Sequence, residues 1–200
     1  MKKALYILIF TLILGCVHKN KSDAVKKVDT TLCEKFNEKY IEFSINNKID
    51  SAYFYLNRAI KCNPENESFK YEKISFLIKN KEYNKALKDL DNIIITSKDI
   101  TYQFLKSIIL YRINDSKAKV ELDKVYSEVS KKSESNFTYL TYKILLDNYF
   151  KGKEYALSEI TSIDTEKIGI AEKQTLKYLQ TKIKDSEKPM DIIFDMFDIE

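Results

Sequence analysis

Glycine and proline are scarce in this chain of 200 residues, which contains three of the first and two of the second. Because these two residues form most of the tight turns between strands, a strand-rich fold would lack the residues that end its strands. The composition therefore predicts an all-α protein.

Histidine is scarcer still, because His18 is the only one in the chain. A single histidine in a polar segment provides no Ser/His or Cys/His catalytic pair and no His/Cys cluster at zinc spacing. Three glycines do not make a phosphate-binding loop. Carboxylate pairs such as Glu34 with Glu38 lie among lysines, where they are normally solvated or ion-paired. We therefore expect no enzyme, no metal site and no cofactor.

A large excess of one charge is also missing, since 34 basic and 30 acidic residues give a formal net charge of +4. Surfaces that bind nucleic acid carry a concentrated basic excess, so this balance argues against a nucleic-acid partner. No feature of the sequence indicates a small-molecule substrate. A protein partner is the remaining expectation.

The N-terminus has the pattern of an export signal: Lys2 and Lys3, an apolar run over residues 4–14, then Gly15 and Cys16. A basic start, a short apolar stretch and a small residue before the cleavage site are typical of signal peptides. The segment Ile-Leu-Gly-Cys resembles the bacterial lipobox. One alternative is a membrane-spanning anchor, but the apolar run is well short of the roughly 20 residues that span a bilayer. The stronger alternative is a plain secretory signal.

The lipobox resemblance implies that residues 1–15 are removed and that Cys16 becomes the lipidated first residue. Residues 16–30 then form a polar, flexible tether. Val17 follows the cysteine, so the aspartate that retains lipoproteins in the inner membrane of enterobacteria is absent. We expect a lipid-anchored protein of the bacterial cell envelope, in the outer membrane and facing the periplasm.

A helical motif recurs along the middle of the chain. Its first two copies are 34 residues apart and consist of Ala52, Leu56, Ala59 and Pro64, and of Ala86, Leu90, Ile93 and Lys98. Two further copies are 38 residues apart and consist of Phe104, Ile108, Tyr111, Ala118, Leu122 and Val125, and of Tyr142, Leu146, Tyr149, Ala156, Ile160 and Ile163. Small residues followed by apolar ones at these spacings suit the second helix of a tightly packed hairpin.

These residues resemble the tetratricopeptide repeat (TPR), although Lys70 and Lys73 stand where that family usually has large apolar residues. The resemblance covers residues 33 to 163 and implies a right-handed α-solenoid of about four helical hairpins within a domain over residues 31–186. The alternative is an ordinary helical bundle whose period arises by chance.

Two segments follow the repeats. Asp164 or Thr165 can cap a helix that runs to Lys184, which would be the capping helix of the solenoid. Residues 187–200 form an acidic amphipathic tail with Met190, Ile193, Phe194 and Phe197 on one helical face. This tail either folds back onto its own domain or serves as a docking motif for another protein.

The TPR resemblance also implies a concave groove that binds a peptide or a helix, because the first helix of each hairpin lines that face. The positions carried over are Asn37, Ile41, Tyr71, Ser75, Ile78, Tyr102, Leu105, Ile109, Arg112, Lys143, Asp147 and Phe150. The family's carboxylate clamp for chaperone tails is not matched, because Asn37 and Ile41 occupy its first positions.

Two cysteines besides Cys16 remain, and they form a possible disulfide. Cys33 opens the first helix of hairpin one and Cys62 closes the second, so antiparallel helices bring the two ends together. A bond forms in an oxidising compartment when the Cα atoms lie about 4.4 to 6.8 Å apart. The alternative is that both are small apolar residues in separate positions.

Three functions are compatible with the sequence. The first is a membrane-anchored scaffold or accessory subunit of a cell-envelope complex that acts through protein–protein interaction. The second is an immunity or inhibitor lipoprotein that neutralises a toxin in the periplasm. The third, an envelope enzyme, would require a pocket with converging titratable groups, and the sequence does not predict one.

Overall fold

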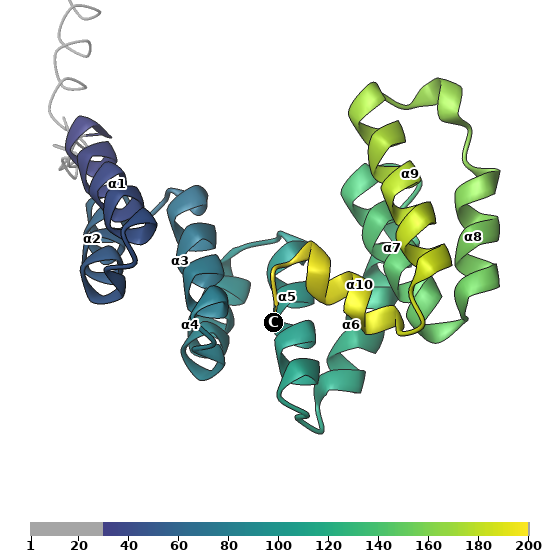
Figure 1. The fold of residues 1–200 in the computed structure, drawn as a ribbon, viewed down its shortest axis with the longest axis horizontal. Helices are drawn as coiled ribbons and strands as arrows, with labels where there is room; N and C mark the ends of the chain where they lie inside the picture. Colours follow the sequence, from purple (N-terminus) through teal and green to yellow (C-terminus); the bar gives the residue numbers. More distant parts are fainter. Residues whose placement is uncertain (1–29, 200) are drawn as a thin grey trace, which may run out of the picture.

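The computed structural model describes residues 30–199, and the regular secondary structure of this part of the chain consists of helices alone (Figure 1). The predicted all-α class is confirmed. The elements are α1 (Thr30–Ile45), α2 (Ile49–Cys62), α3 (Glu67–Lys79), α4 (Tyr83–Thr96), α5 (Ile100–Arg112), α6 (Ala118–Lys132), α7 (Phe137–Phe150), α8 (Lys153–Ser162), the 3-10 turn η1 (Thr165–Lys167), α9 (Ile170–Asp185) and α10 (Pro189–Met196).

The turns inside the first three helical pairs, α1–α2, α3–α4 and α5–α6, have the same backbone conformation. Each turn contains one residue with positive φ: Asn47 at 54°, Lys81 at 58° and Asn114 at 57°. In each, the next N–H donates to the carbonyl five residues earlier, namely Lys48 to Phe43 (2.9 Å), Glu82 to Leu77 (2.8 Å) and Asp115 to Leu110 (2.9 Å). This is the Schellman motif, which satisfies carbonyls at a helix end.

The fourth turn, between α7 and α8, is built differently. Gly152 has a φ of 93°, and its own N–H donates to the carbonyl of Asp147 (3.1 Å). Glycine is the residue that adopts this conformation without steric cost. All four turns therefore contain a residue with positive φ and a hydrogen bond to the carbonyl five residues earlier, but in the fourth turn one residue, Gly152, has both.

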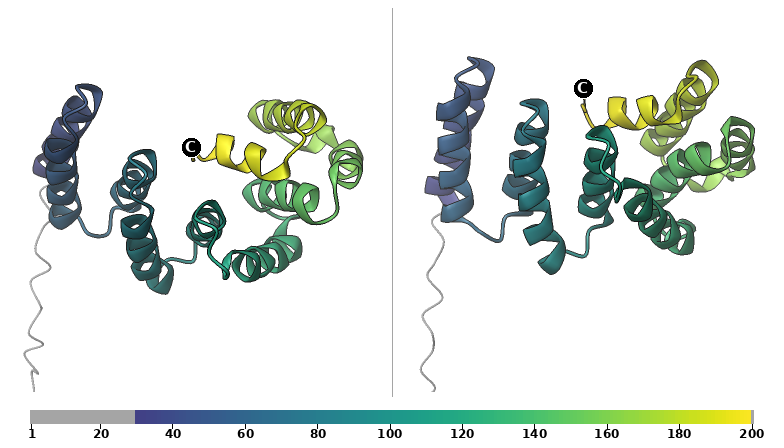
Figure 2. Two further views of the ribbon diagram at one scale, coloured as in Figure 1. Left: turned by 60° about the horizontal axis from the view of Figure 1, so that its bottom comes forward. Right: turned by 90° about the horizontal axis from the view of Figure 1, so that it is seen from below.

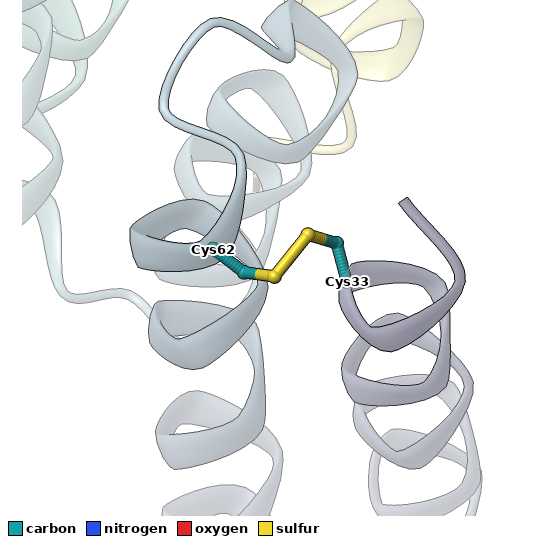
Figure 3. The surroundings of a disulfide bond; sticks show 2 residues. All are labelled: Cys33 and Cys62. Atoms are coloured by element: carbon teal, nitrogen blue, oxygen red, sulfur yellow. A yellow bond between two sulfur atoms is a disulfide. The ribbon is translucent and has the colours of Figure 1, made fainter. Parts of the chain in front are cut away.

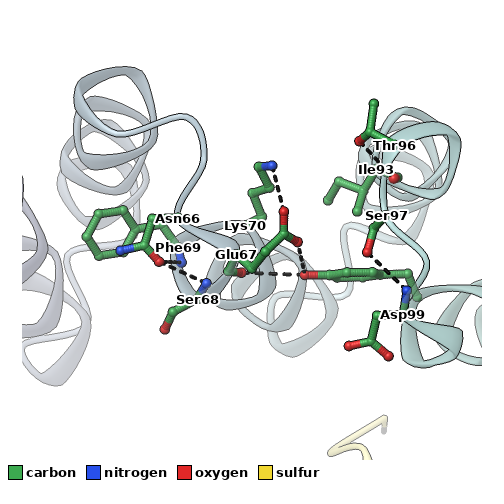
Figure 4. A network of polar contacts seen from close by, with 10 residues as sticks. Asn66, Glu67, Ser68, Phe69, Lys70, Ile93, Thr96, Ser97 and Asp99 are labelled. Atoms are coloured by element: carbon green, nitrogen blue, oxygen red, sulfur yellow. Dashed lines mark hydrogen bonds and ion pairs between the residues drawn. The ribbon is translucent and has the colours of Figure 1, made fainter. Parts of the chain in front are cut away.

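Asparagine and aspartate side chains cap the N-termini of α3, α5 and α7, the first helices of the second, third and fourth pairs. Asn66 Oδ1 accepts from the backbone N–H groups of Ser68 (2.9 Å) and Phe69 (3.3 Å), as Figure 4 shows. Asp99 caps α5 and Asn136 caps α7 in the same way. Such caps satisfy N–H groups that have no partner within the helix.

The repeated small residues lie in the helix-packing surfaces. The alanines at the repeat positions of α2, α4, α6 and α8 are all buried: Ala52, Ala59, Ala86, Ala118 and Ala156. Leu56, Leu90, Leu122 and Ile160 are buried beside them, whereas Ile93 and Ile163 are only half-buried. A side chain no larger than alanine at these points lets the paired helices approach closely.

From α1 to α9, each helix packs against the next along the chain. Figure 2 shows the result as a curved row of helices, with α10 on the inner side of the curve. α10 breaks the sequential order because it packs against α7 as well as against α9, the helix before it. The amphipathic tail thus folds back onto its own chain, which was one of the two alternatives for it.

The helix after the repeats differs from the sequence-based expectation. Asp164 does cap a helix, but only the short turn η1, where its side chain accepts from the N–H of Glu166 (3.1 Å). α9 begins later, after Gly169, whose N–H donates to Glu172 Oε2 (2.6 Å). Within α9, Leu179 and Ile183 are fully buried, whereas Ala171, near the start of the helix, is exposed.

Cys33 and Cys62 form a disulfide between the start of α1 and the end of α2 (Figure 3). Their Cα atoms are 5.4 Å apart, because the antiparallel helices bring these ends together. Cross-linking a loop of this length stabilises a fold by about 3 to 4 kcal/mol, mainly by restricting the unfolded chain. Cys16 and the segment predicted to be a signal peptide lie outside the described residues.

Candidate functional site

The twelve positions of the predicted groove divide by their exposure. Five of them belong to the core: Ile78, Tyr102, Leu105, Ile109 and Asp147. Ile41, Tyr71, Ser75 and Arg112 are exposed, and Asn37, Lys143 and Phe150 are half-buried. The exposed members on α3, Tyr71 and Ser75, line an open hollow, whereas the corresponding surface of α5 and α7 is largely covered.

α10 covers this surface. The Phe197 ring packs against Phe104 of α5, with centroids 5.4 Å apart, and against Tyr142 of α7, at 5.9 Å. The Phe194 ring lies 6.1 Å from the ring of Tyr111 and 5.4 Å from the guanidinium of Arg112. The TPR resemblance implies a ligand on this surface, but in the structure the C-terminal segment of the same chain packs there.

The buried side chain of Tyr102 also links two helical pairs. Its hydroxyl donates to Glu67 Oε2 (3.1 Å) at the start of α3, and Glu67 also pairs with Lys70 (2.9 Å; Figure 4). Burial and the neighbouring carboxylate of Glu67 raise the pKa of Tyr102. The residue therefore connects the second pair to the third.

Asp147 is fully buried and is surrounded by compensating groups. Its carboxylate pairs with Lys143 Nζ (2.7 Å) and Lys151 Nζ (3.2 Å), and it accepts a hydrogen bond from the hydroxyl of Tyr126. Burial and this hydrogen bond raise the pKa of Tyr126. A buried charge requires such partners, so this network explains how Asp147 is accommodated in the helix packing.

The open hollow lies between α1, α3 and the end of α10 and has a volume of about 360 Å³. We call it the α1–α3 groove. Its lining residues are Tyr40, Ser44, Asn47, Ile49, Tyr71, Ser75, Phe76, Lys79, Asn80, Met196, Phe197 and Asp198. Two of them, Tyr71 and Ser75, are positions that the TPR resemblance predicted.

The floor of this groove is aromatic. Phe76 contacts Tyr40 edge-on, with ring centroids 6.0 Å apart, and stacks on Tyr53 at 5.9 Å. Burial raises the pKa of the Tyr40 hydroxyl above its ordinary value. Phe76 is buried, whereas Tyr71 stands at the rim with 40% of its surface exposed. The groove thus combines an apolar floor with a polar rim.

A second hollow of about 350 Å³ adjoins the groove along α10. It is lined by Ile78, Lys79, Phe194, Asp195, Asp198 and Ile199, so Lys79 and Asp198 border both hollows. Sequence reasoning missed the C-terminal residues here because no local pattern links them to α3. Asn47 and Asn80, which line the α1–α3 groove, could have been found from the sequence, because each lies just after the end of a helix.

Among residues 30–199, no group of His, Cys, Asp and Glu side chains is arranged to hold a metal ion. No helix of the same part of the chain is long and apolar enough to cross a bilayer. Comparison of the chain with protein-family models, curated proteins and solved structures gave no match.

Proposed function

We propose that this protein is a lipid-anchored, TPR-like α-solenoid that binds a partner protein of the bacterial cell envelope through the α1–α3 groove. It acts as a scaffold or accessory subunit and performs no catalysis itself. The observation that carries the proposal is the groove at Tyr71 and Ser75, which is open, aromatic-floored and bordered by two successive helical pairs.

The recurring turns support the repeat part of this proposal. Asn47, Lys81 and Asn114 have nearly equal positive φ values and lie 34 and 33 residues apart in the chain. A helical bundle with a chance hydrophobic period has no reason to repeat a backbone turn at the same interval. Sequential packing from α1 to α9 is what a stack of repeats requires.

The composition of the groove supports binding of a protein. Exposed aromatic side chains such as Tyr71 bury much area on binding and lose little conformational entropy, which makes them common in protein interfaces. The rim supplies neutral hydrogen-bonding groups, including Ser75 and Asn80. Such a surface suits a polypeptide better than a nucleic acid.

Purification of the lipidated protein from detergent-solubilised membranes tests the interaction. Ser75 is exposed in the groove, so Ser75→Trp fills the site without altering the core. The matched control is Ser130→Trp, at an exposed position of α6 outside the groove. We expect the wild type and the Ser130 variant to retain the same partner and the Ser75 variant to lose it. Equal recovery with all three chains would contradict the proposal.

Cell fractionation tests the anchor. Acyl chains on Cys16 would hold the protein on a membrane, each buried methylene contributing about 0.8 kcal/mol. We expect Cys16→Ala to block processing, so that the precursor accumulates. A Cys16→Ala chain that is cleaved at the normal rate and recovered in the soluble fraction would refute lipidation.

A further inference from the structure

We infer that the side of the α1–α2 pair that faces away from α3 lies against the surface of an anionic phospholipid bilayer. We call this side the α1–α2 aromatic face, and it consists of Phe36, Lys39, Phe43, Phe54, Tyr55 and Arg58. The inference rests on the lipid anchor of the proposed function and adds a membrane contact of the folded domain itself. It is carried by the clustering of rings and cations, by their exposure and by the distribution of charge.

The aromatic face points away from the rest of the protein. α1 and α2 form one end of the row of helices (Figure 1), and Tyr40 and Tyr53 turn towards the second pair, where both contact Phe76 of α3. Tyr55 follows Tyr53 by two residues, which is about 200° around the helix, so its ring lies on the opposite side of α2. None of the six residues of the face lines the α1–α3 groove, so a membrane on this face does not occupy the groove.

Rings from both helices form one platform together with a cation. The Phe43 ring of α1 stacks on the Tyr55 ring of α2, with centroids 5.3 Å apart, and Phe54 meets Tyr55 edge-on at 5.2 Å. The guanidinium of Arg58 lies 4.2 Å from the centroid of the Phe36 ring and 5.7 Å from that of Phe54, which is 56% exposed. Exposed rings beside Lys and Arg side chains are typical of protein surfaces that lie at the level of lipid headgroups.

The two cations of the face have no carboxylate partner. Lys39 and Arg58 are exposed, and neither forms an ion pair with any residue between 30 and 199. By contrast, Lys73 in the second pair is bound to Asp89 (2.8 Å). Lys39 lies instead 5.4 Å from the centroid of the Tyr55 ring. A cation over a ring keeps its charge uncompensated, so it remains available to the phosphate groups of anionic lipids.

The acidic residues of α1 lie largely on another side of the helix. Glu34, Glu38 and Glu42 follow one another at intervals of four and therefore form one stripe. Glu34 and Glu38 are each two residues from Phe36, about 200° around the helix, so they face away from its ring. The stripe leaves the basic and aromatic side chains together on the opposite side.

The charge along the chain is also biased towards the proposed anchor. Residues 17–62 include nine basic and six acidic residues, a net charge of +3, whereas residues 63–200 include 23 basic and 24 acidic residues, a net charge of −1. Cys16 precedes the start of α1 by 14 residues, which span at most about 50 Å, so acyl chains on Cys16 would keep the α1–α2 pair close to the bilayer. A basic surface next to an acyl anchor strengthens binding to anionic membranes.

Tryptophan fluorescence tests the inference, because the chain contains no tryptophan. The full-length lipidated protein with Phe54→Trp is reconstituted into vesicles of phosphatidylglycerol and brominated phosphatidylcholine. The control is Tyr178→Trp, at an exposed position of α9. We expect emission at shorter wavelength and at least about twofold stronger quenching for Phe54→Trp, because interfacial side chains sit about 5 to 10 Å deep. In vesicles of brominated phosphatidylcholine alone, this difference should be lost.

Charge variants test the part played by the cations. Lys39→Gln with Arg58→Gln, added to the Phe54→Trp chain, should reduce its quenching to the level of the control. Lys119→Gln with Lys131→Gln removes the same charge from exposed positions of α6 and should leave the quenching unchanged. Equal melting temperatures would show that all these chains are folded.

The outcomes separate the inference from the anchor on which it rests. The acyl mass on Cys16 tests the anchor by itself, and its absence would refute lipidation. An acylated chain that floats with the vesicles but is quenched equally at positions 54 and 178 would overturn the inference and leave the anchor intact. Quenching that survives Lys39→Gln with Arg58→Gln would also overturn it. An emission shift of the Phe54→Trp chain in native membranes, without one in protein-free vesicles, would identify a protein on this face and likewise overturn the inference.

Discussion

The first helical pair and the last six α-helices are stabilised in different ways. The α1–α2 pair has two small buried clusters, around Ala59 and Leu56, and it is cross-linked by the Cys33–Cys62 disulfide. The helices from α5 to α10 share one extended core in which Phe104, Leu105 and Ile109 are almost completely buried. A covalent bond thus supplements burial at the end that has one neighbour, while α9 and α10 cover the other end.

The two regions also differ in what they leave exposed. Five large apolar side chains are exposed among residues 30–62: Leu32, Ile41, Ile45, Ile49 and Phe54. Residues 100–199, three times as many, also expose five: Ile113, Val120, Tyr155, Ile170 and Tyr178. The disulfide-linked pair therefore offers the greater density of apolar contact surface, and it borders the α1–α3 groove.

The largest expected effect lies in the shared core. Phe104→Ala removes a fully buried ring that contacts both Tyr142 and Phe197, so we expect a loss of about 3 to 5 kcal/mol in the free energy of unfolding. Phe54→Ala, in the first pair, should cost less than about 1 kcal/mol because this ring is 56% exposed. Urea denaturation measures both, and equal losses would contradict the contrast between the regions.

Loss of the disulfide should affect the first pair alone. For the double change Cys33→Ser and Cys62→Ser we expect about 3 to 4 kcal/mol less stability, confined to α1 and α2. Hydrogen exchange should then show faster exchange in residues 30–62 and unchanged protection in α5 to α9. A uniform loss of protection would mean that the two regions unfold as one unit.

Overpacking at a repeated alanine comes next in size. Ala86→Phe should cost roughly 1 to 3 kcal/mol because Ala86 is fully buried in the helix packing. Lys88→Phe, two residues away and exposed, should change the stability little. Thermal unfolding compares the two variants, and equal shifts would show that the small-residue positions are not the packing surfaces.

The smallest effect concerns alkaline pH. Burial raises the pKa of Tyr142 to about 12, while an unfolded tyrosine ionises near pH 10, so the folded state holds this proton longer. The stability contributed by Tyr142 is thus complete below about pH 10 and is lost as the pH rises towards about 12. Tyr142→Phe should lose less stability than wild type over this range. An identical decline in both proteins would contradict the buried position of this hydroxyl.

Local patterns explain how much of this architecture could be predicted from the sequence. The alanine and leucine spacing located α2, α4, α6 and α8, because helix packing leaves a short-range periodic signal. The position of α10 left no such signal, since Phe197 meets Phe104 and Tyr142, which are far away in the chain. The groove positions of α5 and α7 were therefore predicted as open although α10 and the helix packing bury several of them.

Site-specific photo-cross-linking in the producing cell tests the central claim, that the α1–α3 groove binds the partner. A benzoylphenylalanine in place of Tyr71, 40% exposed at the groove, is compared with one in place of Tyr178, 42% exposed on α9. We predict one discrete cross-linked protein from position 71, abolished by Ser75→Trp, and none from position 178. The same cross-link from both positions, or one from position 71 that survives Ser75→Trp, would contradict the account.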